Sequence, residues 1–277
     1  MIRPAARRVA FFISDGTGIT AEMLGNSLLT QFEGIEFEHI TVPFVDSGDK
    51  ARQCVERISA EAQRSGTRPI VFTTLIDDTV RGIIRGSNAL VLDFFERFMM
   101  PLEDELGLKS AHTVGRSHSA MDIKEYQERI EAVNFSLAHD DGLTQRDMHK
   151  ADVILVGVSR SGKTPTCLYL ALQFGIKAAN CPLIPEDFER MSLPSTIRPF
   201  REKLYGLSIA PERLQQIRNE RRPDSSYATL ENCRFEVSQA ERLMEREGIR
   251  WLNSTTKSIE EIATTILQDM HLGRRTY

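Results

Sequence analysis

Eight consecutive residues near the middle of the chain have the spacing of a phosphate-binding loop, with a lysine and a threonine directly after its second glycine. In such a loop, backbone N–H groups and the positive end of the following helix surround a diphosphate. The lysine reaches the terminal phosphate and the threonine hydroxyl helps to hold Mg²⁺. The pattern therefore predicts nucleotide binding, rather than a merely structural turn, by Gly157, Val158, Ser159, Arg160, Ser161, Gly162, Lys163 and Thr164.

The segments on either side of the loop favour the same interpretation. Residues 153–156 form a short apolar run rich in β-branched side chains, which is typical of a buried parallel strand. Residues 165–174 form a helical segment that begins with proline and stops at Gly175, the usual asymmetry of a helix. The sequence thus predicts a strand, a phosphate-binding loop and a helix in succession.

Two adjacent carboxylates, Asp140 and Asp141, lie in a predicted turn shortly before this strand. A carboxylate there could accept the proton of a hydroxyl group or coordinate Mg²⁺. A solvated Asp-Gly turn is an equally good interpretation. The second Mg²⁺ ligand stays unassigned, because Asp152 precedes its strand and because Glu186 and Asp187 follow a proline.

Four arginines recur along a predicted helix from residue 211 to residue 222, which ends before Pro223. Such a helix could fold over phosphates as a lid and neutralise charge in a transition state. It could equally be an exposed helix face. The arginines are Arg213, Arg218, Arg221 and Arg222.

A second glycine motif follows the first predicted strand. Residues 15–21 match G-x-G-x-x-A and open a helix, which is the pattern of a dinucleotide-binding turn. The acidic residue expected at the end of the second strand is missing, since that strand ends Thr41-Val42-Pro43. A dinucleotide site, another phosphate or substrate contact, and a plain tight turn all remain open.

The elements that must position these residues alternate between strand and helix. Alternation of this kind implies a mainly parallel sheet with helices on both faces. In the first half, strands are expected at 9–14, 37–42 and 69–76, and helices at 19–32, 50–64, 77–86 and 90–106, the last kinked or divided at Pro101. In the second half, strands are expected at 152–156, 177–184, 204–209 and 250–253, and helices at 165–174, 211–222 and 259–267.

Residues 115–150 are polar and charged around a predicted helix at 123–138, and we place a domain junction there. The sequence therefore predicts two α/β domains. Residues 1–145 form an N-terminal, mainly parallel α/β domain, and residues 146–277 form a C-terminal α/β domain of the phosphate-loop kinase type.

Composition limits the classes of protein that the chain can belong to. The hydrophobic content of 41% and the charged content of 27% are typical of a soluble globular protein, and no apolar run is long enough to cross a membrane. The four cysteines are far apart, which indicates neither a disulfide framework nor a zinc site and favours a cytoplasmic location. Residues 146–277 carry a net charge of +3, which suits phosphate binding but is too small to indicate nucleic acid.

Taken together, these segments resemble the bacterial regulatory proteins of phosphoenolpyruvate synthase, relatives of the pyruvate, phosphate dikinase regulatory proteins. The resemblance spans nearly the whole chain, and its loop motif Gly-Val-Ser-Arg-x-x-Lys-Thr-Pro is specific. The family's loop often lacks the second glycine, which Gly162 supplies here. The residues that carry the resemblance include 14–22, His118, Tyr126, 139–142, 151–160, 163–166, 179–180, Pro211, 213–214, 217–218, Arg221 and 258–263.

The resemblance implies two opposed phosphate transfers. Proteins of this family use ADP to phosphorylate a threonine of the synthase, and they remove that phosphate with inorganic phosphate, releasing pyrophosphate. The diphosphate of ADP and the pyrophosphate product are the same chemical group, so one cradle containing Lys163 and Thr164, with Mg²⁺, could serve both directions. Asp140 or Asp141 is the candidate for orienting the target hydroxyl.

Two other functions stay open from the residues alone. One is a small-molecule kinase or NTPase, which would transfer phosphate to a metabolite without a protein partner. The other is a nucleotide-sensing module that binds ADP without turnover. The loop does not distinguish ADP from ATP, and the sequence leaves open the choice between the two related dikinase-type partners and the oligomeric state, a homo-oligomer included.

Overall fold

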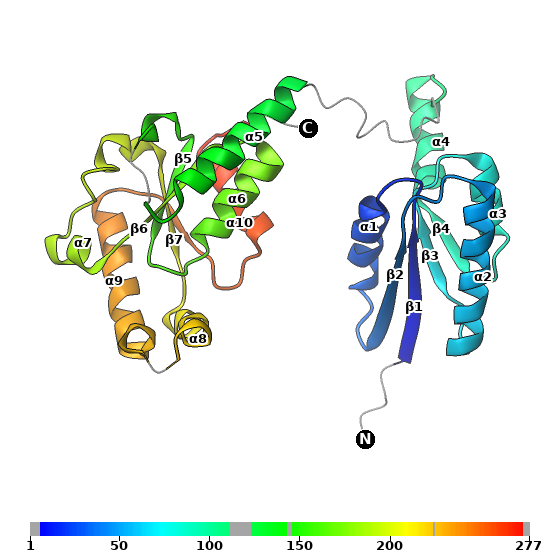
Figure 1. Cartoon of the computed structure of the whole chain (residues 1–277), viewed down its shortest axis with the longest axis horizontal. Helices are drawn as coiled ribbons and strands as arrows, with labels where there is room; N and C mark the ends of the chain where they lie inside the picture. The colour runs from blue at the N-terminus through cyan, green and yellow to red at the C-terminus, as the bar shows by residue number, and fades with distance from the viewer. Residues whose placement is uncertain (1–5, 111–122, 143–145, 224, 274–277) are drawn as a thin grey trace. The chain divides into compact units, whose positions relative to one another are not determined.

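The computed structural model describes residues 6–110, 123–142, 146–223 and 225–273. The chain divides into two compact units, Met1–Ala120 and Met121–Tyr277, and each contains one parallel four-stranded sheet (Figure 1). The predicted fold class, two α/β domains with parallel sheets, is confirmed. The sequence analysis places the junction later, after residue 145. The difference comes from α5 (Ile123–Ala138), which packs against the second unit.

The first unit has the strand order β2-β1-β3-β4, with every neighbouring pair parallel. Both faces of strand β1, one of the two inner strands, are buried. Val9, Phe11 and Ile13 pack on one face with residues of α2 and α3, and Ala10 and Phe12 pack on the other with residues of α1. The elements are β1 (Ala6–Ile13), α1 (Ile19–Leu29), β2 (Ile35–Val42), α2 (Gly48–Ser65), β3 (Ile70–Thr73), α3 (Asp78–Arg85), β4 (Leu90–Asp93) and α4 (Phe94–Leu106).

The prediction of a helix over residues 90–106 is wrong for its first four residues. Leu90–Asp93 forms β4 and pairs in parallel with β3, Leu90 opposite Ile70. A four-residue apolar run is too short for its periodicity to distinguish strand from helix. The helix begins only after Asp93, whose carboxylate accepts a hydrogen bond from the backbone N–H of Glu96 at 3.0 Å, and it continues through Pro101 without being divided.

The second unit has the strand order β6-β5-β7-β8, again with every neighbouring pair parallel. Its strands and its main helices lie close to the predicted ranges, and α7 and α9 are additional helices that the sequence analysis did not assign. The elements after α5 are β5 (Val153–Gly157), α6 (Lys163–Phe174), β6 (Ala178–Pro182), α7 (Pro185–Arg190), β7 (Leu204–Ser208), α8 (Pro211–Arg221), α9 (Leu230–Arg246), β8 (Trp251–Asn253) and α10 (Ile259–Asp269).

The side chains on the two faces of the inner strand β5 belong to two separate hydrophobic cores. Ile154 and Val156 pack with residues of α7, α8 and α9, whereas Val153 and Leu155 pack with residues of α6 and α10. The chain leaves β5 toward β6 on one side and later returns as β7 on the other side. Loops that diverge at such a point open a crevice at the carboxyl ends of the strands, where open α/β sheets bind their ligands. The predicted phosphate-binding loop leaves β5 at this point.

Two expectations from composition can be compared with the fold. None of the helices in the described ranges has the length and apolar character needed to cross a bilayer. All four cysteines are described, and each is buried as a free thiol. Among the described residues, no group of three or more His, Cys, Asp or Glu side chains is arranged to hold a metal ion.

Candidate phosphate-binding site

The loop between β5 and α6 depends on two glycines for its path. Gly157 has a φ of 143°, and a Cβ atom there would lie 2.1 Å from the carbonyl oxygen of Leu207 on the neighbouring strand. Gly162 has a φ of 96° and caps the start of α6. Both angles lie where residues with side chains are strained, so glycine is needed at the first position and favoured at the second. The loop therefore turns where the motif predicts.

Neighbouring elements hold the loop in place. The backbone N–H of Leu183 donates to the carbonyl oxygen of Gly157 at 3.0 Å, and the Ser254 hydroxyl donates to the carbonyl oxygen of Ser161 at 2.9 Å. Ser161 is 1% exposed, and its Oγ has no hydrogen-bond partner in the part of the chain that the structure describes. The burial of Ser161 and the hydrogen bond to its carbonyl oxygen hold the middle of the loop against the core.

Lys163 is buried under the loop, with 3% of its surface exposed. Its Nζ donates to the carbonyl oxygens of Gly157 at 3.1 Å and Val158 at 2.8 Å. Burial lowers the pKa of this ammonium to about 8, and the nearby carboxylate of Asp141 acts in the opposite direction. The site thus holds a partly desolvated positive charge, whose attraction for phosphate is stronger than that of a lysine in water.

Four polar side chains from three segments meet beside the loop. The Thr164 hydroxyl donates to Oδ1 of Asp140 at 2.8 Å. Nδ2 of Asn180 on β6 lies 2.6 Å from the same carboxylate oxygen, 3.1 Å from Oδ1 of Asp141 and 3.0 Å from Oγ1 of Thr164. Asn180 is 1% exposed, so the cluster is anchored in the core. The structure thereby brings the loop threonine and the Asp140–Asp141 pair together.

The position of the two carboxylates depends on His139. This histidine is buried, its ring stacks on Phe135 with 3.9 Å between centroids, and its Nδ1 lies 2.8 Å from the Phe135 carbonyl oxygen. Its own carbonyl oxygen accepts from the backbone N–H of Asn180 at 3.0 Å. Asp141 then takes the left-handed conformation, with φ 49°. Aspartate tolerates that region better than most residues, because its short side chain can bond locally.

The donor atoms beside the loop suit Mg²⁺. The Thr164 hydroxyl and the Asp140 carboxylate are hard oxygen ligands within hydrogen-bond distance of each other. Where Mg²⁺ binds together with a phosphate, one or two protein oxygens hold it, and water and phosphate oxygens fill the remaining positions. Of the acidic residues considered in the sequence analysis, Asp140 and Asp141 line the cavity beside the loop, whereas Asp152, Glu186 and Asp187 do not.

A cavity of ≈ 540 Å³ lies in front of the loop, and we call it the loop cavity. Carboxylates border it on one side, and an exposed arginine of α8, Arg221, borders it as well. Three of the predicted loop residues do not line the cavity and contribute only to the backbone path of the loop. They are Gly157, Val158 and Ser161. The lining consists of Asp140, Asp141, Ser159, Arg160, Gly162, Lys163, Thr164, Pro165, Asn180 and Arg221.

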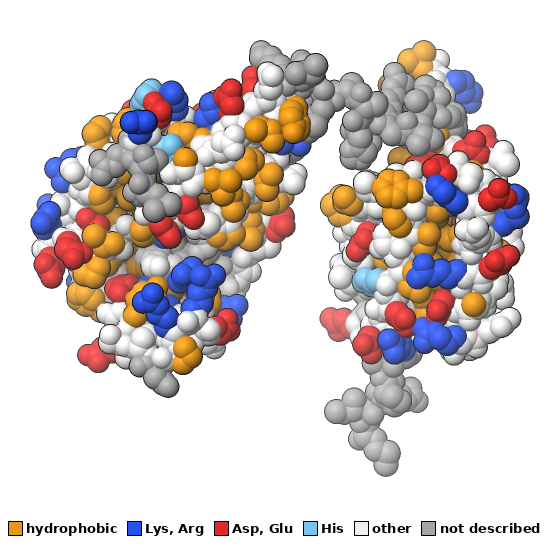
Figure 2. Space-filling view, in the orientation of Figure 1, with side chains coloured by type: hydrophobic (Ala, Val, Ile, Leu, Met, Phe, Trp, Pro, Cys, Tyr) orange, Lys and Arg blue, Asp and Glu red, His pale blue; other side chains and the backbone are white. Residues whose placement is uncertain are grey.

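The four arginines expected on a lid helix have different positions. Arg218 is fully buried, and Arg221 and Arg222 are exposed at the end of α8 near the loop. Arg213 does not line the loop cavity, and its guanidinium donates to Gln216 at 3.2 Å. Lys and Arg side chains gather over α8 on the face of the second unit shown in Figure 2. Part of the predicted arginine set therefore borders the loop.

The glycine motif of the first unit forms a tight, internally bonded turn. Oδ2 of Asp15 accepts from the backbone N–H of Ile76 at 2.9 Å, and Oγ of Ser14 accepts from the backbone N–H of Gly16 at 3.1 Å. The Thr74 hydroxyl donates to the same Ser14 oxygen at 3.0 Å. These bonds tie the end of β1 to the end of β3, which supports the interpretation of the motif as a turn.

Sequence reasoning did not assign a role to Asn180, His139 or Ser254 in the site. Asn180 carries a recognisable signal, because it is a single amide in the otherwise apolar run Ala178–Cys181. A polar residue in a strand that is buried on both faces needs partners, and such residues often serve a site. Ser254 gives no comparable signal, since it is one polar residue after a short strand.

A parallel α/β sheet with a glycine loop at its switch point, a buried lysine and a threonine paired with a carboxylate is the arrangement that a phosphate-binding loop requires. Comparison of the sequence with known proteins narrows the class of protein. Residues 10–267 match the family described as "Kinase/pyrophosphorylase", and the chain belongs to that family.

Near full-length relatives carry a more specific name. Proteins of Burkholderia cenocepacia (strain HI2424), Burkholderia orbicola (strain MC0-3) and Burkholderia multivorans (strain ATCC 17616 / 249) are each 62% identical to this chain over 267 residues. The match covers 96% of this chain and 98% of each relative. All three are named "Putative phosphoenolpyruvate synthase regulatory protein". The resemblance on which the sequence analysis relies is confirmed.

Proposed function

We propose that this chain is a bifunctional enzyme that uses ADP to phosphorylate a threonine of phosphoenolpyruvate synthase and uses inorganic phosphate to remove that phosphate. The family description, which joins a kinase and a pyrophosphorylase, supports the pairing of two reactions. The name of its relatives supports the synthase as the protein substrate. The residues that line the loop cavity support the transfer of a phosphate group.

In the kinase direction, ADP³⁻ and the threonine hydroxyl give AMP²⁻, a phosphothreonine dianion and one proton. The loop amides and Lys163 hold the diphosphate, and they stabilise the charge that builds on the leaving AMP oxygen. Asp141 accepts the hydroxyl proton, since it is exposed and lines the cavity. Thr164 and Asp140 would hold Mg²⁺, which supplies further neutralisation of the phosphate charge when bound.

In the opposite direction, a phosphothreonine dianion and HPO₄²⁻ give threonine and P₂O₇⁴⁻. The oxygen of inorganic phosphate attacks phosphorus, the bond to the threonine oxygen breaks, and the proton of the phosphate passes to that oxygen. Asp141 can carry this proton from one oxygen to the other. The product is a diphosphate like that of ADP, so the loop and Lys163 bind it in the same way.

One observation carries the proposal: Lys163, Thr164, Asp140 and Asp141 all face a single cavity. Purified chain should transfer the β-phosphate of labelled ADP to a threonine of the synthase, with AMP as the other product. Lys163→Met should abolish both directions together, because both use the same diphosphate position. Lys257→Met is the matched control, since Lys257 is exposed and does not line the loop cavity.

Other results would point to the other functions. Label found on a metabolite in the absence of the synthase would indicate a small-molecule kinase. Tight ADP binding without transfer to any acceptor would indicate a nucleotide-sensing module. Loss of only one direction in Lys163→Met would show that the two reactions use separate sites, against the proposal.

A further inference from the structure

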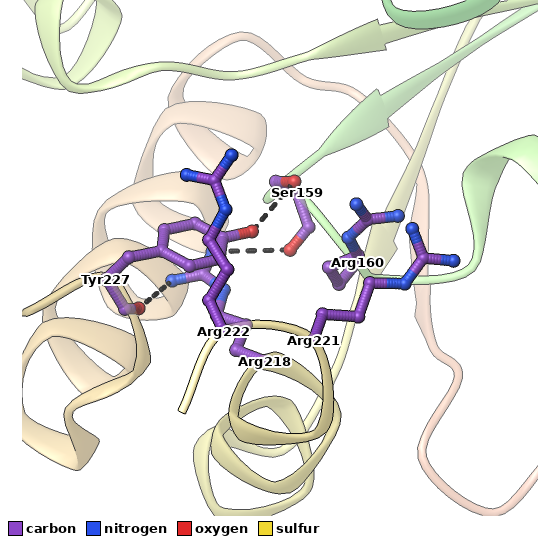
Figure 3. Close-up of a pocket in the computed structure, with 6 residues that line it drawn as sticks. All are labelled: Ser159, Arg160, Arg218, Arg221, Arg222 and Tyr227. Carbon is purple, nitrogen blue, oxygen red and sulfur yellow. Dashed lines mark hydrogen bonds between the residues drawn. The ribbon is translucent and has the colours of Figure 1, made fainter. Parts of the chain in front are cut away.

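A second cavity, of ≈ 460 Å³, adjoins the loop cavity, and we call it the arginine cavity. The two cavities share Ser159, Arg160 and Arg221 in their linings, so they are neighbours along the first half of the loop. Figure 3 shows the guanidinium groups of Arg160 and Arg221 beside Ser159, with Arg222 and Tyr227 on the other side. The lining consists of Ser159, Arg160, Arg218, Arg221, Arg222 and Tyr227.

The arginine cavity carries unneutralised positive charge. Among the described residues, its lining contains four arginines and no Asp or Glu. Across the described ranges, the guanidinium groups of Arg160, Arg221 and Arg222 form no ion pair and no hydrogen bond with another side chain or with a carbonyl oxygen. Three such groups around one hollow repel each other, and an anion bound between them would relieve that repulsion.

Arg218 has a different role, because it is completely buried and already paired. Its Nη2 lies 2.6 Å from Oε2 of Glu236 and donates to the Ser159 carbonyl oxygen at 3.2 Å. Its Nη1 donates to the Tyr227 carbonyl oxygen at 3.0 Å, and its guanidinium lies 3.9 Å above the Tyr227 ring. The Tyr227 hydroxyl in turn donates to Oγ of Ser159 at 3.0 Å. These contacts join α8, the loop and the segment after α8 into a fixed floor.

The residues that line the arginine cavity suit a phosphate group better than a nucleobase. A purine ring is usually held between apolar surfaces, and this cavity has none beyond Tyr227, whose ring already has the Arg218 guanidinium against it. Planar guanidinium groups suit the oxygens of a phosphate dianion, which they bind in pairs. Arg221 and Arg222 are exposed, whereas Lys163 is 3% exposed. A phosphate attached to a large protein can therefore reach the arginine cavity more easily than the buried end of the loop.

We propose that the arginine cavity is a second phosphate site. In the dephosphorylating direction it binds the phosphate dianion that reacts with the phosphate held in the loop, and in the kinase direction it binds the phosphoryl group that leaves the diphosphate. This inference rests on the proposed function and adds the place where the second phosphate binds. In the dephosphorylating direction two separate phosphates must come together before they are linked as P₂O₇⁴⁻. One occupies the loop and the other the arginine cavity, with Arg160 and Arg221 common to both.

Substitution of Arg222 isolates this cavity, because Arg222 lines the arginine cavity and not the loop cavity. Inorganic phosphate and O-phospho-L-threonine are titrated by calorimetry into full-length protein saturated with ADP. Removing one charged hydrogen-bond donor in Arg222→Gln should weaken phosphate binding about tenfold or more. Arg213→Gln, the same change on the same helix, should bind as the unaltered protein does, and Arg222→Lys should recover part of the affinity.

The same variants then identify the source of the phosphate in the dephosphorylation reaction. If the site takes the phosphoryl group of the protein substrate, Arg222→Gln raises the half-saturating concentration of phosphorylated synthase. If it takes free phosphate, the half-saturating concentration of inorganic phosphate rises instead. Either result supports a second phosphate site.

The binding measurement separates this inference from the proposed function. ADP-saturated protein that binds neither probe, or Arg222→Gln and Arg213→Gln that bind equally well, would overturn the arginine cavity as a phosphate site, even if both reactions are observed. Conversely, an absence of transfer to the synthase would remove the proposed function and leave the binding result standing.

Discussion

At the scale of single residues, the site depends on burying one ammonium group without a carboxylate in direct contact. Lys163 donates only to carbonyl oxygens of its own loop, and burial brings its pKa down to about 8. A phosphate dianion beside this group favours the charged form and raises the pKa again. Ligand binding and protonation of Lys163 are therefore coupled.

This coupling predicts how ADP affinity depends on pH. Below pH 8 the ammonium is already present, and above pH 8 it must take up a proton before it can bind phosphate. The association constant should fall about tenfold between pH 7 and pH 9, since each unit above the pKa of the free protein removes about tenfold of the charged form. Calorimetry at both pH values measures it. Lys257→Met should show the same fall, and a constant affinity would contradict the role of Lys163.

We expect the two neighbouring aspartates, Asp140 and Asp141, to have different functions. Asp140 is bonded to Thr164 and Asn180, whereas Asp141 is exposed at the edge of the cavity. Asp141→Asn fits the left-handed backbone there, because asparagine also tolerates positive φ. We expect its turnover in both directions to fall about a hundredfold, the usual contribution of a general base, with ADP affinity changed much less. Unchanged turnover would remove Asp141 from the mechanism.

At the scale of elements, the strand–loop–helix unit depends on the close approach of the loop to β7. Gly157→Ala would place a Cβ atom 2.1 Å from the Leu207 carbonyl oxygen, whereas a Cβ atom on Gly162 would meet nothing within 4 Å. Both positions have positive φ. The first substitution should lower the free energy of unfolding by about 3 kcal/mol, and the second by about 1 kcal/mol, the cost of the backbone conformation alone.

Urea unfolding of the two variants measures this difference, and ADP binding reports whether the loop keeps its path. Equal destabilisation would show that the contact with Leu207 relaxes at little cost. A Gly162→Ala variant that still binds ADP would show that the loop keeps its path without glycine at that position.

Element positions were predictable where the sequence carries a local signal. The loop, its two flanking elements and most of the parallel strands follow from glycine spacing and from apolar runs between helices. The strand Leu90–Asp93 was not predictable, because only its pairing with β3 distinguishes it from the first turn of α4. The arginines of α8 show the same limit, since helical spacing does not determine which of them turns toward the loop.

At the scale of the whole molecule, every described residue that lines the loop cavity belongs to the second unit. The contact between Asp140 and Thr164 joins residues 24 positions apart, and that of Asn180 with Asp140 joins residues 40 apart. The sequence indicates the chemistry of both partners but not their meeting, which depends on α5 packing against α6 and β6. The same limit applies to the domain junction. Composition places it at residue 145, but the packing of α5, which the sequence does not reveal, makes this helix part of the second unit.

The division of the chain predicts how fragments should behave. A fragment of residues 121–277 retains both faces of the β5 sheet, α5 and every residue that lines the loop cavity. It should unfold cooperatively in urea and bind ADP with an affinity within about threefold of that of the full chain, because independently folded domains keep their own cores.

A shorter fragment of residues 146–277 provides the comparison. It keeps the loop and Lys163 but lacks α5, the stacked pair of Phe135 and His139, and both aspartates. Removing α5 exposes its buried contact surface on α6 and β6 and leaves Thr164 and the buried amide of Asn180 without their carboxylate partners, which destabilises the unit. We expect this fragment to lose Mg²⁺-dependent ADP binding and to unfold at lower urea. Equal ADP binding by the two fragments would show that residues 121–145 do not contribute to the site, and the roles given to Asp140 and Asp141 would then have to be abandoned.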